Sequence, residues 1–195
     1  MNTLIGYHGT TAENAEKILK DQRFLDSNKN NEWLGKGVYF FAYRGHAEWW
    51  ISQKKYREKN TAVLQAKLEY EDNQLLDLDD PEQLKRLDQF IKIYVDKLNK
   101  LKDRTLKIEW SKQTLEQRIC ASCNLLKQYE ENIGIIIYTF FWDRLYDNSK
   151  FRINQRQICV NEHSIITTII MEPTEGNDTT QDIDLNILED GGILC

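Results

Sequence analysis

The spacing of apolar residues changes twice along the chain, and this change limits the possible fold more than any other feature. From Asp80 to about residue 130, apolar side chains recur every three or four residues, which is the spacing of one-faced helices. On both sides of this region the apolar runs are short and either alternate or are rich in β-branched residues, as in strands. Strands at both ends with a helical insertion at about 80–130 predict an α+β domain rather than a doubly wound sheet.

The boundaries of the expected elements follow from local signals. Thr10-x-x-Glu13 fits a capping box and predicts a helix that begins there and ends near residue 21. Asp80-Pro81 predicts the start of the long helix. Further helices are expected at 45–58 and 111–129, and strands at 3–8, 37–42, 62–69, 74–78, 157–160 and 165–170. The run 133–140 is rich in β-forming residues, but its pattern is ambiguous. We expect a single domain over 1–195, with a loosely ordered acidic tail after Pro173.

Composition narrows the class of protein. The 195 residues carry a net charge of −5, which argues against a broad nucleic-acid groove. The N-terminus has no basic segment followed by an apolar one, and the longest apolar run, 133–142, is too short to cross a bilayer as a helix. We therefore expect a cytoplasmic protein without a membrane partner.

Four cysteines are present, and two of them form the pair Cys120-x-x-Cys123. The pair stands inside a helical pattern, with no second pair and no nearby histidine. Packing is therefore the favoured interpretation over zinc binding or redox chemistry, and no metal is expected.

Three short segments are candidates for chemistry. They are Tyr7-His8-Gly9-Thr10, the run WLGKGVYF at 33–40, and the run QRQICV at 155–160. In this order they resemble the ADP-ribosyltransferases of the diphtheria-toxin and poly(ADP-ribose) polymerase class. That class carries His-Gly on its first strand, Gly-x-Gly-[IV]-Tyr-Phe on a later strand, and usually a glutamate on a strand near the C-terminus.

The resemblance implies a split β-sheet core and a reaction that breaks the nicotinamide–ribose bond of NAD. Gly9 would let the backbone grip the nicotinamide amide. Tyr39 and Trp50, or less favourably Trp49, would stack on the ring. His8 would donate a hydrogen bond to a ribose hydroxyl. Each residue also has an ordinary structural interpretation, as a local hydrogen-bond partner, a core aromatic or a turn glycine.

The third segment departs from the usual pattern. Gln157 stands where the polymerases have glutamate, and glutamine cannot stabilise a cationic transition state by charge. This favours transfer of a single ADP-ribose. Gln155, on the same strand face, is a candidate contact for the acceptor, and Glu162 is a fallback acid. Ala47 falls where the polymerases place a serine that binds the nicotinamide amide.

A cation is needed for the pyrophosphate. Arg44, Lys36 and Arg23 are candidates, and a surface salt bridge is the alternative role for each.

The resulting hypothesis is an NAD-dependent mono-ADP-ribosyltransferase with a protein, RNA or DNA acceptor. An intracellular toxin or anti-phage effector with an antitoxin or inhibitor partner would fit this class. The alternative is a degenerate fold that binds NAD, ADP-ribose or a protein without catalysis. A further rival is a thiol hydrolase that uses Cys159 and His163.

Overall fold

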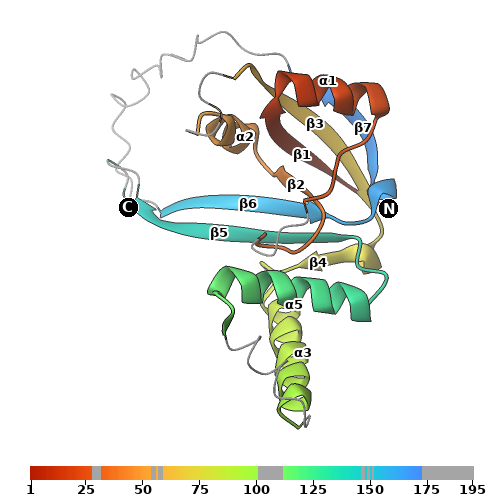
Figure 1. The fold of residues 1–195 in the computed structure, drawn as a ribbon, viewed down its shortest axis with the longest axis vertical. Coiled ribbons are helices and arrows are strands. Elements are labelled where there is room, and N and C mark those ends of the chain that lie inside the picture. Colours follow the sequence, from red (N-terminus) through yellow and green to blue (C-terminus); the bar gives the residue numbers. More distant parts are fainter. Residues whose placement is uncertain are drawn as a thin grey trace, which may run out of the picture.

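The computed structural model describes residues 1–27, 32–53, 56, 59–100, 112–145, 148, 150 and 152–172. In these ranges the chain forms one seven-stranded sheet and four α-helices (Figure 1). The strands are β1 (Asn2–Thr11), β2 (Val38–Phe41), β3 (Thr61–Tyr70), β4 (Leu75–Asp77), β5 (Ile135–Leu145), β6 (Arg152–Val160) and β7 (Ile166–Met171). The helices are α1 (Ala12–Asp21), α2 (Arg44–Ile51), α3 (Pro81–Lys100) and α5 (Leu115–Tyr129). The expected tail after Pro173 lies outside the described residues.

The sheet has the strand order β4-β5-β6-β2-β1-β3-β7. Only β4 and β5 run parallel, and every other neighbouring pair is antiparallel. A parallel pair needs a long crossover, and α3 and α5 are part of the chain between β4 and β5. The predicted α+β class with a helical insertion is confirmed.

The joint between β1 and β2 is the narrowest in the sheet. These strands share one register pair, Tyr7 with Phe41. By contrast, β1 pairs with β3 over its whole length, from Asn2 with Tyr70 to Thr11 with Thr61. The sheet is therefore continuous but almost divided, with β1, β3 and β7 on one side of the joint and β2, β6, β5 and β4 on the other.

Two apolar clusters cover opposite faces of β2. Val38 and Phe40 belong to the first cluster, to which α1 contributes Ala15. Tyr39 packs against the second cluster, which includes Cys123 of α5. Because successive side chains of a strand alternate between its faces, this division follows from the sequence order itself. Figure 1 shows α1 at one end of the sheet, with α3 and α5 together near β4 and β5.

The predicted capping box at Thr10 is wrong. The N-cap of α1 is Thr11, whose side chain accepts a hydrogen bond from the Asn14 backbone N–H at 3.3 Å. Thr10 is buried in β1 opposite Ala62. Pairing with β3 extends β1 to Thr11, so the helix begins one residue later than the local pattern predicts.

The start of the long helix is as predicted. The Asp80 carboxylate accepts a hydrogen bond from the Glu82 N–H at 2.8 Å, as an N-cap side chain does. α2 ends at Ile51, short of the predicted residue 58, and 54–55 and 57–58 lie outside the described residues. None of the helices in the described ranges combines the length and the apolar character that a bilayer crossing requires.

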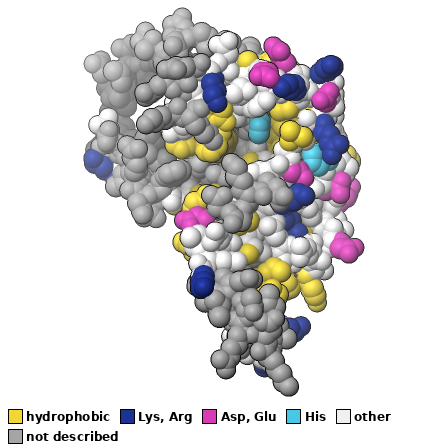
Figure 2. Space-filling model, viewed as in Figure 1, with side chains coloured by type: hydrophobic (Ala, Val, Ile, Leu, Met, Phe, Trp, Pro, Cys, Tyr) yellow, Lys and Arg dark blue, Asp and Glu magenta, His cyan; other side chains and the backbone are white. Residues whose placement is uncertain are grey.

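Charge is mixed over the surface that Figure 2 displays. Acidic and basic side chains are interspersed on the described part of this face and do not gather into one basic surface. This agrees with the low pI of about 5.3.

Candidate functional site

A row of side chains crosses the middle of the sheet. Tyr7 pairs with Phe41, Phe41 pairs with Gln157, and Gln157 pairs with Tyr138, on β1, β2, β6 and β5 respectively. Directly paired residues of antiparallel strands point to the same face. All four are partly buried. We call Tyr7, Phe41, Gln157 and Tyr138 the central row. It joins three aromatic rings and one amide from both sides of the narrow joint.

Helix α2 packs closely on β1 beside this row. A Cβ atom at Gly9 would lie 2.6 Å from the Ala47 carbonyl oxygen and 2.8 Å from the Ile51 side chain. Gly9 is therefore required by the approach of α2, whatever its role toward a ligand. Ala47 is fully buried, so it does not replace the serine of the polymerases as a ligand contact.

α2 also brings Trp50 and His46 against the central row. The Trp50 ring centroid is 6.2 Å from that of Phe41, and His46 is also 6.2 Å from Phe41. The two α2 residues are four apart and share one helix face. Of the predicted ring-stacking pair, Trp50 therefore meets Phe41 rather than Tyr39.

The two predicted glutamines lie together. The Gln157 amide N–H donates to the Gln155 side-chain oxygen at 3.3 Å, and Gln155 is buried. Arg156 between them pairs with Asp77 at 3.2 Å. Glu162, the fallback acid, follows the end of β6 and accepts a hydrogen bond from the Ser164 N–H. Its carboxylate is thus engaged in a local turn.

His8 is held by the backbone of the second motif. Its Nδ1 lies 2.8 Å from the Tyr39 carbonyl oxygen, and its ring packs edge-on against Phe24 and Phe40. A carbonyl only accepts, so Nδ1 carries the proton. Burial lowers the pKa of His8, which keeps the ring neutral at pH 7. The neutral ring therefore offers Nε2 as an acceptor, which reverses the predicted donation to a ribose hydroxyl.

The Tyr39 hydroxyl forms its hydrogen bonds within the protein. Its hydroxyl donates to the Gly35 carbonyl at 2.7 Å and accepts from the Leu34 N–H at 2.8 Å. Burial raises the pKa of the phenol well above its usual range. Because His8 contacts Phe40, the His8 ring and the Tyr39 phenol lie on opposite faces of β2. The two motifs meet through a backbone hydrogen bond and not through their side chains.

Backbone conformation and packing also explain the two glycines of the second motif. Gly35 has a φ of +84°, which favours glycine, and a Cβ at Gly37 would lie 2.6 Å from the Val160 carbonyl. The Lys36 N–H between them donates to the Asn124 side chain of α5 at 2.8 Å. The loop before β2 is thereby fastened to α5.

The three candidate cations have different surroundings. Arg44 pairs with Glu48 at 2.8 Å and with Glu172 at 3.3 Å, so its alternative role in salt bridges is the one observed. Lys36 Nζ lies 3.9 Å from Asp26. Arg23 makes no ion pair within the described part of the chain.

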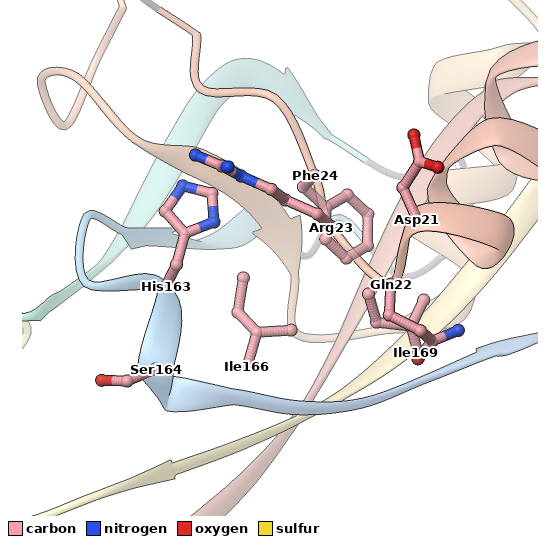
Figure 3. A pocket seen from close by; sticks show the side chains of 8 residues that line it. All are labelled: Asp21, Gln22, Arg23, Phe24, His163, Ser164, Ile166 and Ile169. Atoms are coloured by element: carbon pink, nitrogen blue, oxygen red, sulfur yellow. The ribbon is translucent and has the colours of Figure 1, made fainter.

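Arg23 borders a pocket of about 390 Å³ between the end of α1 and β7 (Figure 3). Phe24, which contacts His8, forms part of its wall. Figure 3 shows the Arg23 side chain extending toward His163 across the pocket. His163 in turn lies 2.7 Å from an Asp26 carboxylate oxygen. The pocket thus offers one guanidinium that makes no ion pair with a described residue, beside the Phe24 ring that contacts His8.

A second pocket, of about 340 Å³, lies near η2 (Asp72–Gln74) and Gly134. Glu71, Glu131 and Glu162 are in its lining, and none of its lining residues belongs to the three motifs. An acidic lining is unsuited to a dinucleotide phosphate.

The three cysteines that the structure describes, Cys120, Cys123 and Cys159, are buried. Cys123 lies in the second cluster, and burial raises its pKa to about 12. Burial likewise raises the pKa of Cys159 to about 11, and its Sγ faces the carbonyls of Gly35 and Lys36. A thiol that stays protonated at neutral pH is a poor nucleophile. No hydrogen bond joins the Cys159 thiol to His163 among the described residues, so the pair that the thiol-hydrolase rival needs is not brought together. No set of three metal-ligating side chains comes together among the residues described.

Phe41, Tyr138 and His46 lie outside the three sequence motifs, and Tyr7 stands in the first motif without an assigned role. Phe41 could have been found, because it lies two residues after Tyr39 and strand alternation places both on one face. The others enter the site only through register and helix packing.

The comparisons with known proteins assign no family. No family model and no solved structure matches the chain significantly. A protein of Methanocaldococcus jannaschii named "Uncharacterized protein MJ0359" is 38% identical over 76 residues. That similarity covers 37% of this chain and 36% of the archaeal protein. The chain therefore spans little more than a third of that relative's length in the matched region.

Proposed function

We propose that the protein is an NAD-dependent mono-ADP-ribosyltransferase. The observation that carries the proposal is the convergence of the three motif segments on adjacent central strands. His8-Gly9 lies on β1, Tyr39-Phe40 on β2 and Gln155–Gln157 on β6. They meet where β1 and β2 share a single register pair, which suits the split core that the family resemblance implies.

In this proposal the nicotinamide lies on the central row. Phe41 and Trp50 offer aromatic faces, and the flat ring of nicotinamide stacks favourably on such faces. Gln157 then hydrogen-bonds a hydroxyl of the adjoining ribose, while Gln155 fixes the Gln157 amide from behind. Cleavage of the nicotinamide–ribose bond leaves an oxocarbenium-like sugar, which an acceptor nucleophile attacks.

On the other face of the sheet, His8 Nε2 is a hydrogen-bond acceptor beside Phe24, and Arg23 makes no ion pair with a described residue. Because this face is opposite to the central row, the roles of His8 at a ribose hydroxyl and of Arg23 at the pyrophosphate stay predictions. Arg44 and Lys36 are less suited because carboxylates lie beside both.

A neutral amide at position 157 has consequences for the product. It positions the ribose but adds no negative charge against the cationic transition state, and it cannot act as a base for a growing chain. We therefore propose transfer of one ADP-ribose to a protein, RNA or DNA acceptor. A toxin or anti-phage effector in the cytoplasm, held in check by an inhibitor protein, stays a prediction.

The alternative is a fold that binds NAD, ADP-ribose or a protein without catalysis. It is favoured by the amides, rather than carboxylates, that β6 contributes to the row. It is favoured also by Glu162, whose carboxylate is used in the turn after β6.

Calorimetric titration of the full chain with NAD, beside an assay for released nicotinamide, separates these functions. The transferase binds NAD, releases nicotinamide and labels a macromolecule in a cell lysate supplied with isotopic NAD. Gln157→Ala should abolish release, and the matched control Asn154→Ala, an exposed residue of the same strand, should not. Binding without release identifies the non-catalytic module. Absence of NAD binding refutes the transferase and leaves only a module that binds ADP-ribose or a protein.

A further inference from the structure

His46 carries an unusual atom. Its Nδ1 is buried and has no hydrogen-bond partner within the described chain. The ring is held edge-on between Phe41, at 6.2 Å, and Tyr43, at 5.7 Å. Its position is therefore defined by aromatic packing, while its buried nitrogen contributes nothing to the fold.

Buried polar atoms in folded proteins nearly always have partners. The environment also disfavours charging the ring, since burial lowers the pKa of His46. The nitrogen is closed to solvent while the residue as a whole is only partly buried, so a small turn of the imidazole is needed before a partner from outside the chain can reach the nitrogen. Its neighbour Phe41 belongs to the central row, next to Gln157.

We propose that His46 recognises the carboxamide of nicotinamide and so sets the specificity of the site for NAD. The inference rests on the proposed function, because it needs the nicotinamide on the central row. A carboxamide carries both an N–H donor and a carbonyl acceptor. It can therefore satisfy Nδ1 whichever ring nitrogen holds the proton.

The neighbouring residue strengthens the assignment. Ala47 of α2 has no polar side chain and is fully buried where α2 packs on Gly9 of β1, so it cannot bind the amide. His46 precedes it directly and lies on the helix face that also carries Trp50, four residues later. One face of α2 would then supply both the aromatic surface and the hydrogen-bonding group for the same ring.

The test compares NAD with its deamido analogue, in which a carboxylate replaces the carboxamide. The parent chain should bind NAD at least about tenfold more tightly, the effect of one hydrogen bond in a desolvated site. His46→Phe, which keeps a ring against Phe41 and Tyr43, should bring the two affinities to within about twofold. The matched control is Tyr129→Phe, an exposed aromatic of α5, which should keep the parent's discrimination.

A second readout does not depend on a ligand. His46→Phe removes an unsatisfied buried nitrogen, so the free protein should melt about 2–4 °C higher, whereas an imidazole needed for structure would make it melt lower. If the phenylalanine variant does not fold, His46→Gln, which keeps a hydrogen-bonding group, should retain the preference for NAD. Unchanged discrimination in His46→Phe, or equal affinities in a folded His46→Gln, overturns the inference alone. A parent chain that does not bind NAD overturns the proposed function with it.

Discussion

Tyr39→Phe is the most informative single change to the second motif. It removes one oxygen and keeps the ring. The Leu34 N–H then loses its acceptor, and Leu34 is fully buried, so water cannot readily replace it. The Gly35 carbonyl loses its donor but keeps the Cys159 thiol at 3.8 Å. One fully unsatisfied N–H costs about 1–3 kcal/mol, and we expect a loss of about 2 kcal/mol in the free energy of unfolding.

For a chain of 195 residues this loss corresponds to a fall of about 4–8 °C in Tm. Thermal and urea unfolding measure it, with Tyr129→Phe as the control because its side chain is largely exposed. Tyr39→Ala should cost more, about 3–5 kcal/mol, because the ring packs against the second cluster. A Tm within 1 °C of the parent in Tyr39→Phe would refute the reasoning.

The remaining predictions concern the N-cap of α1, the titration of His8 and the product expected with Gln157. Thr11→Ala should lower the free energy of unfolding by about 1 kcal/mol through loss of the N-cap, whereas Thr11→Ser, which keeps the capping hydroxyl, should not. Helicity and urea unfolding of both variants test this, and a Thr11→Ala variant as stable as the parent would show that Thr11 is not the cap. Burial lowers the pKa of His8 in the folded state below its ordinary value of 6.5. The unfolded chain therefore binds more protons at this residue, and the free energy of unfolding falls as pH drops below 6.5. His8→Gln should show a shallower decline in urea midpoints over that range. With Gln157 in place of an acid, labelled NAD and lysate should yield single bands on a gel, and a long ladder would remove the role assigned to Gln157.

The sequence by itself determined the kinds of elements and their order. Apolar periodicity distinguishes the helical insertion from the strands because helices and strands expose different repeats to the core. The Asp80-Pro81 start was predictable for the same reason, since an N-cap involves only residues within one turn. Such signals depend only on residues that are close in sequence, so they can be recognised without knowing which segments pack together.

Tertiary structure alone decided which side chains meet. Thr11 rather than Thr10 is the N-cap of α1, because pairing with β3 extends β1 to Thr11. Gly9 lies against Ala47 because α2 packs on β1 at that point. The direction of the His8 hydrogen bond depends on a carbonyl 31 residues away. Likewise, the central row exists only through the registers of four strands. Register and helix packing are set by contacts between distant segments, and a linear pattern carries little information about them.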